Sequence, residues 1–277
     1  MKKATSKSKP GPKPKAKPKT KPKTTTKRSR IKMLAVTNVV LFVATIIVNT
    51  LGAQGFINGS SQADVSKMFP TMITPAGFTF SIWGVIYTLL GVSLLVMLAK
   101  HTQKVYQKQI ERISVLFWLS CAINMIWIVA FSCQFIGLSA ILIVALLASV
   151  FCIIRRLADL HPGAETVATL GFGLYGGWLA IASVVNFCAF LVSQNFQFWG
   201  EEQLFYTILL AIFIVGATSL TNVHKNTLFN VAIAWAFFGI VQRTSFEEYG
   251  HLYSVLLIGI VLLVLSGGAN LRSKLSK

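Results

Sequence analysis

The sequence predicts an all-α integral membrane protein with about eight transmembrane helices. Hydrophobic residues make up 54% of the 277 residues and charged residues only 12%, a balance that a water-soluble domain could hardly cover with polar surface. The apolar residues form separate runs, most of them close to the roughly 20 residues needed to cross a bilayer core. The loops between the runs alternate in charge, as expected when successive loops lie on opposite sides of a membrane.

Residues 1–31 form a basic Lys/Pro-rich segment that we expect to be disordered. It has almost no apolar side chains to bury, so burial cannot offset the entropy lost on ordering. Fourteen of the 26 Lys and Arg residues lie within the first 32 positions, which concentrates the net charge of +18 here. The composition indicates a solvated cytoplasmic tail, leaves open its adhesion to anionic lipid headgroups, and predicts no specific nucleic-acid partner.

Eight apolar runs follow this tail. The first is longer than the apolar region of a cleaved signal peptide and follows a much longer basic segment, so it predicts a retained membrane anchor. The seventh run is the shortest and fits a membrane span least well. The runs are 33–51, 78–99, 113–132, 135–154, 167–192, 204–220, 227–241 and 252–269.

Loop charges test the number of spans independently of hydropathy. With residues 1–31 in the cytoplasm, that side of the bilayer collects 24 basic and three acidic residues, against two basic and five acidic residues on the other side. Cytoplasmic loops carry the excess of Lys and Arg in membrane proteins. If the run at 227–241 did not cross the membrane, the basic residues after the last run, Arg272, Lys274 and Lys277, would lie on the non-cytoplasmic side. We therefore expect a multi-pass cell-membrane protein with the bilayer as its solvent and both termini in the cytoplasm.

The interiors of the runs contain no Asp, Glu, Lys, Arg or His. Ionisable residues within membrane spans mark ion pathways and proton relays, so their absence argues against proton-coupled transport. The four cysteines show no metal-ligand spacing, and no nucleophile paired with a base can be recognised. We expect neither an enzyme nor a metal site.

Three runs carry aromatic and amide side chains at helical spacing. Ordinary bundle packing uses such residues too, because amides form hydrogen bonds across helices. Several amides and indoles facing one interior would also form an apolar ligand cavity with a few orienting polar groups. The candidate ligand-binding residues are Trp83, Tyr87, Asn124, Trp127, Tyr175, Trp178 and Asn186.

These motifs resemble the TspO/MBR family, the tryptophan-rich sensory and translocator proteins that include the peripheral-type benzodiazepine receptor. The resemblance covers roughly residues 33–192 and rests on three segments in register. They are TPAGFTFSIWGVIYTLLG at 74–91, Asn124-Met-Ile-Trp127, and Leu174-Tyr175-Gly-Gly-Trp178 followed by Asn186. The resemblance implies a five-helix membrane domain at 32–192 in which the seven candidate residues line or brace a ligand pocket.

Family members bind tetrapyrroles such as porphyrin and haem, and some bind sterols or benzodiazepine-type drugs. The resemblance therefore implies noncatalytic binding of a hydrophobic planar ligand, with a transport or sensory role and no required cofactor. The family usually has aromatic residues in its first loop as a lid, whereas this chain has no Trp between residues 52 and 73. Residues 193–277 are expected to form a three-helix membrane extension that the short members lack.

Two other functions stay open at this point. One is a substrate permease that works without proton coupling. The other is a structural membrane protein whose basic tail holds a partner. A homodimer also stays open.

Overall fold

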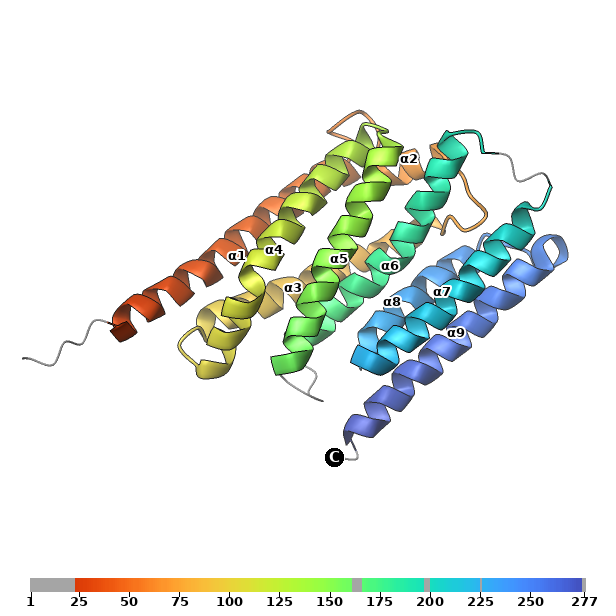
Figure 1. Cartoon of the computed structure of the whole chain (residues 1–277). Helices are drawn as coiled ribbons and strands as arrows, with labels where there is room; N and C mark the ends of the chain where they lie inside the picture. Colours follow the sequence, from red (N-terminus) through yellow and green to blue (C-terminus); the bar gives the residue numbers. More distant parts are fainter. Residues whose placement is uncertain (1–22, 161–165, 197–199, 225, 276–277) are drawn as a thin grey trace, which may run out of the picture.

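The computed structural model describes residues 23–160, 166–196, 200–224 and 226–275. Within these residues the regular structure is entirely helical, which confirms the predicted fold class (Figure 1). The elements are α1 (Lys23–Ala53), α2 (Gln62–Met68), the 3-10 helix η1 (Gly77–Ser81), α3 (Ile82–Ala99), α4 (Lys104–Ser132), α5 (Ile136–Leu160), α6 (Val167–Ser193), α7 (Glu202–His224), α8 (Thr227–Val241) and α9 (Phe246–Leu275).

Seven helices in the described part of the chain are long and apolar enough to cross a membrane. The predicted run at 227–241 is α8, an apolar helix of 15 residues. At 1.5 Å per residue such a helix is about 22 Å long, shorter than the ~30 Å hydrocarbon core. Because α8 returns the chain between α7 and α9, α1 begins and α9 ends at the same end of the bundle (Figure 1).

The boundary of the basic tail requires a correction. We expected disorder up to residue 31, but α1 already begins at Lys23, and the rest of the expected tail, residues 1–22, lies outside the described residues. Two features account for the earlier start of the helix. Ile31 is fully buried, and Lys27 Nζ lies 3.5 Å from Glu111 Oε1 of α4. Contacts with α4 therefore continue beyond the apolar run of α1.

Five helices form a closed ring in the order α1, α3, α6, α5, α4, and each packs against its neighbours in this order. The ring order differs from the chain order because α3 lies between α1 and α6. These five helices correspond to the expected membrane domain at 32–192. The candidate site lies at one end of this ring.

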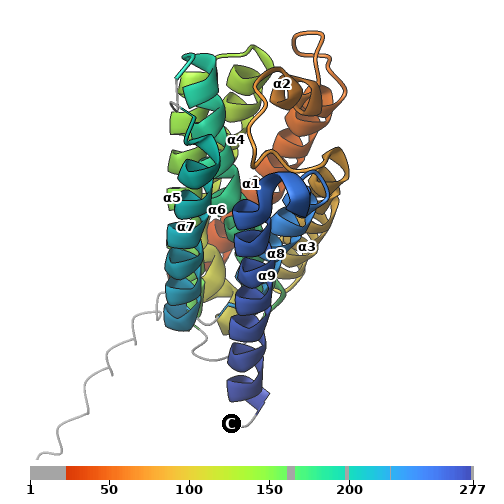
Figure 2. The ribbon, with the colours of Figure 1, turned by 90° about the vertical axis from the view of Figure 1, so that its right-hand side faces the viewer.

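Helices α7, α8 and α9 pack outside the ring, with α8 against α6 and α9 over α8 (Figure 2). Glycines in α6 allow α8 to come close. A Cβ atom at Gly177 would overlap the carbonyl group of Phe229, and one at Gly173 would overlap the Asn226 side chain. Asn226 also caps α8, since its Oδ1 accepts from the Phe229 N–H while its Nδ2 donates to the Thr169 carbonyl over 2.7 Å. Helix α8 is thus docked closely on the ring, while α9 packs on α8 and α7 packs mainly on α9.

Candidate functional site

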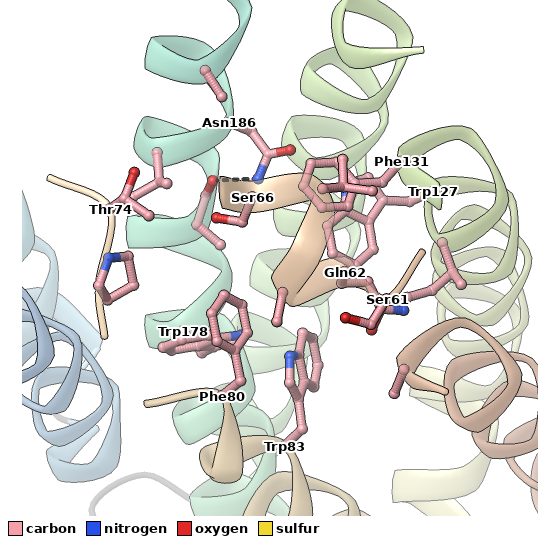
Figure 3. Close-up of a pocket in the computed structure, with 18 of the residues that line it drawn as sticks. Ser61, Gln62, Ser66, Thr74, Phe80, Trp83, Trp127, Phe131, Trp178 and Asn186 are labelled. Carbon is pink, nitrogen blue, oxygen red and sulfur yellow. Dashed lines mark hydrogen bonds between the residues drawn. The ribbon is translucent and has the colours of Figure 1, made fainter. Parts of the chain in front are cut away.

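A cavity of about 360 Å³ lies within one end of the helix ring, a size within the range of small-molecule sites. The C-terminal halves of α1, α4 and α6 form much of its wall. The chain from Thr74 into the start of α3 forms another part, and α8 contributes Ala236 and Ile240. Short helix α2 lies against the cavity as well (Figure 3).

Aromatic rings from three helices meet in this cavity. Trp83 stacks on Tyr87 with 5.3 Å between ring centroids and meets Trp178 edge-on at 6.1 Å. Trp127 stacks on Phe131 at 5.6 Å on the α4 side (Figure 3). Of the seven candidate residues, five line the cavity, namely Trp83, Tyr87, Trp127, Trp178 and Asn186.

The other two candidates, Asn124 and Tyr175, do not line the cavity but lie behind its wall. Asn124 is fully buried and its Nδ2 donates to the Tyr175 hydroxyl over 3.0 Å. Its Oδ1 accepts a hydrogen bond of 2.6 Å from Nδ2 of Asn49, which does line the cavity. Asn124 therefore braces the site through Asn49, and the Tyr175 ring meets the ring of the lining residue Trp83 edge-on at 5.8 Å.

The amide group of Asn186 is held from two sides. Its Nδ2 donates to the Ala182 carbonyl one turn earlier in α6, and its Oδ1 accepts from the Ser139 hydroxyl of α5 over 3.3 Å. Because a carbonyl oxygen can accept two hydrogen bonds, Oδ1 keeps a lone pair for a further donor. The structure thus orients this amide at the cavity wall (Figure 3).

Helix α2 is the main feature that the sequence analysis did not identify. It lies in the loop without Trp and contributes Gln62 and Ser66 to the cavity, with Ser61 just before it. A capping box starts α2: Ser61 Oγ accepts from the Asp64 N–H, and Asp64 Oδ2 accepts from the Ser61 N–H over 3.2 Å. The Ser61 hydroxyl also donates to Asp64 Oδ2 over 2.6 Å. This bond and the one from the Ser61 N–H stabilise the carboxylate and lower the pKa of Asp64. The Ser-x-x-Asp spacing was the sequence signal for this helix.

The described residues that line the cavity include no Asp, Glu, Lys, Arg or His. Two buried nitrogen atoms at the cavity, Gln62 Nε2 and Trp127 Nε1, have no hydrogen-bond partner within the described part of the chain. A buried donor without a partner costs roughly 1–3 kcal/mol, so an acceptor atom on a ligand would relieve this cost. The site offers hydrogen-bond donors and aromatic faces without charge.

No cluster of three or more His, Cys, Asp or Glu residues that could hold a metal ion occurs in the described ranges. The four cysteines are free, and Cys121 and Cys188 are buried in the core.

The fold defines a multi-pass α-helical membrane protein with an apolar cavity at one end of its helix bundle. The model of the family described as TSPO-like protein matches residues 35–268. The chain therefore belongs to the TSPO-like protein family, which confirms the resemblance found in the sequence. The match extends through α7 and α8 into α9, beyond the five-helix ring. No curated protein and no solved structure matches the chain significantly.

Proposed function

We propose that this protein is a noncatalytic membrane receptor that binds a hydrophobic planar ligand, either a tetrapyrrole or a sterol, in the cavity. The observation that supports this proposal best is the aromatic wall of Trp83, Tyr87, Phe80 and Trp178. Phe80 meets Trp178 edge-on at 5.9 Å, and Trp83 stacks on Tyr87. Aromatic faces and edges of this kind suit the flat surface of a macrocycle or a fused ring system.

The uncharged lining determines how a tetrapyrrole would lie. A carboxylate buried without a partner is costly, so the macrocycle would enter the cavity while its carboxylates stay near the partly exposed helix α2. Ser61, Gln62 and Ser66 offer hydroxyl and amide groups there. Among the described lining residues, Tyr87 is the one side chain of a type that can ligate haem iron, and none is His, Cys or Met. Recognition would therefore depend mainly on the faces of the ring.

Titration of the purified protein with protoporphyrin, followed by quenching of Trp fluorescence, tests the proposal. We expect saturable binding that Trp178→Leu weakens roughly tenfold, because the variant loses an aromatic contact and buried area. Trp118→Leu is the matched control, since Trp118 donates to Asn38 Oδ1 and does not line the cavity. Equal, nonsaturating quenching in all three proteins would mean that protoporphyrin only partitions into detergent, and the proposal would be wrong.

Flux measurements in liposomes separate this proposal from the alternative of a permease without proton coupling. A receptor would retain the ligand, whereas a permease would move it between compartments at a rate that depends on Trp178. The alternative of a structural protein with a partner-binding tail depends on residues 1–31 instead, so shortening this tail would remove that activity and leave binding at the cavity intact.

We also propose that both termini face the cytoplasm. The asymmetry of Lys and Arg between alternate loops supports this orientation. Two exposed positions at opposite ends of the bundle, Lys104 and Glu247, can each be changed to cysteine in a cysteine-free background. An impermeant maleimide should label Glu247→Cys in intact cells and Lys104→Cys only after permeabilisation. The opposite pattern would reverse the orientation.

A further inference from the structure

Helix α8 connects the cavity with the C-terminal helices. Ala236 and Ile240 lie four residues apart, so they share one face of the helix, and both line the cavity. Their exposed fractions are 1% and 0%, although both belong to a helix outside the ring. The ring alone therefore does not enclose the cavity, since α8 supplies part of the wall.

A neighbouring part of α8 holds the segment that leads into α3. The Ala76 N–H donates to the Gly239 carbonyl over 3.0 Å, and Trp235 Nε1 donates to the Thr79 carbonyl over 2.9 Å. Thr79 is fully buried, and a Cβ atom at Gly239 would overlap its side chain. Close backbone approach at Gly239 thus fixes this segment on α8.

The same segment turns other side chains to the cavity. Thr74, Pro75 and Phe80 line it, and the Phe80 ring meets the Trp178 ring edge-on (Figure 3). On the α8 side of the segment, Phe78 packs edge-on against Trp235 at 5.7 Å. Helix α8 consequently forms part of the wall itself and also holds a second part of the wall in place.

From these contacts we propose that α8 belongs to the ligand site. Ala236 and Ile240 contact the bound ligand and set the width of the cavity on this side, so they determine which ligands fit. The inference rests on the proposed function and assigns a role to the C-terminal helices, namely ligand selectivity. The small side chain at position 236 leaves room that a larger one would fill.

Ala236→Phe places an aromatic ring in this room, and Val231→Phe is the matched control. Val231 lies on the same helix with 43% of its surface exposed, so its replacement leaves the cavity unchanged. We expect Ala236→Phe to weaken protoporphyrin binding roughly tenfold or more because its ring occupies ligand space, while Val231→Phe binds like the unsubstituted protein. Thermal unfolding in detergent checks that both variants are folded.

Ile240→Ala is a second variant that changes the cavity in the opposite direction. It removes side-chain volume from the same wall, so we expect the affinity for the bulkier tetraphenylporphyrin to rise relative to that for protoporphyrin. This ratio of affinities is insensitive to the fraction of protein that is folded, because both ligands are measured on the same sample.

The outcomes separate this inference from the proposed function. Protoporphyrin binding that is the same in the unsubstituted protein and in folded Ala236→Phe, with no change of ligand ratio in Ile240→Ala, would overturn the role of α8 alone. An unsubstituted protein without saturable binding would overturn the proposed function, and this inference with it. Loss of binding in Ala236→Phe together with the altered ratio in Ile240→Ala would support both.

Discussion

Asn49 in α1 donates a hydrogen bond to Asn124 in α4, with 2.6 Å between Nδ2 and Oδ1. The Asn124 amide in turn donates to the Tyr175 hydroxyl of α6 over 3.0 Å. The exposed fractions of Asn49, Asn124 and Tyr175 are 9%, 0% and 4%. One buried chain of polar groups thus joins three helices of the ring, from Asn49 at the cavity wall to Asn124 and Tyr175 behind it.

Breaking this chain should lower stability and affect the site together. We expect Asn124→Ala to lower the free energy of unfolding by roughly 1–2 kcal/mol, because it leaves two buried polar groups with fewer partners. Combining Asn49→Ala with Asn124→Ala should cost less than the sum of the single changes, since each removes the same hydrogen bond. Unfolding in mixed detergent measures all three free energies. Strictly additive effects would show that the two amides are not coupled.

The contact between α6 and α8 predicts opposite results at two glycines. Gly177→Ala should lower the free energy of unfolding by about 1–3 kcal/mol, because its Cβ atom would overlap the Phe229 carbonyl. A Cβ atom at Gly216 in α7 would lie in open space, so Gly216→Ala should be neutral or raise the free energy of unfolding by up to about 1 kcal/mol through helix propensity. Thermal unfolding compares the variants. Equal effects at both positions would contradict the close approach of α8.

The stability of the capped first turn of α2 should depend on pH. The hydrogen bonds from Ser61 favour ionised Asp64 and hold its pKa below the ordinary value of 3.8. This contribution to the capping of α2 is fully present above that ordinary value and is lost as pH falls through the lowered pKa. Hydrogen exchange of the amides at residues 62–68, corrected for intrinsic rates, should therefore accelerate at low pH.

Two substitutions test the same capping box at neutral pH. Ser61→Ala and Asp64→Asn should accelerate exchange in α2. The first removes the hydroxyl that accepts from the Asp64 N–H, and the second replaces the charged acceptor of the Ser61 hydrogen bonds with a weaker neutral one. Lys67→Ala is the control, because its pair with Asp64 is largely exposed and contributes little. An effect of Lys67→Ala as large as that of Ser61→Ala would assign the stability of α2 to the ion pair instead.

We propose that the basic segment binds anionic lipid headgroups, and the first turns of α1 should then contribute to this binding. Arg28, Arg30 and Lys32 are exposed just beyond the apolar run. Each basic residue close to an anionic surface contributes about 1 kcal/mol, and salt screens this attraction. Phosphatidylglycerol should thus raise the Tm more than phosphatidylcholine does, and replacing the three residues by Gln should reduce the difference. A difference that neither high salt nor these substitutions reduce would disprove the proposal.

The membrane helices were predictable because hydrocarbon admits only segments that satisfy their own backbone hydrogen bonds. Length and hydropathy therefore located the spans, and loop charge supported α8 although it has only 15 residues. Helix α2 was missed because its seven residues, in a polar loop, have neither the length nor the hydropathy of a membrane span. The start of α1 at Lys23 depends on contacts with α4, which lies far along the chain.

The site was predictable in part for a similar reason. Helical spacing brought Trp178 and Asn186 to one wall, because both lie on one stripe of α6. Spacing does not determine how deep a residue lies, so Asn124 and Tyr175 could not be separated from the lining residues. The contact of Gly239 with Thr79 joins segments about 160 residues apart and leaves no local pattern in the sequence.

The order of the ring has a consequence for synthesis of the chain. Helix α3 leaves the ribosome second among the membrane helices, but its neighbour α6 is made only after α4 and α5. The ring cannot close before then, and the wall contributed by Ala236 and Ile240 follows later still. Because chains are made from the N-terminus, a nascent chain that ends before α8 has an incomplete cavity and leaves the glycines of α6 facing lipid. The chain can therefore bind a ligand in the complete cavity only after nearly all of it has been synthesised and inserted into the membrane.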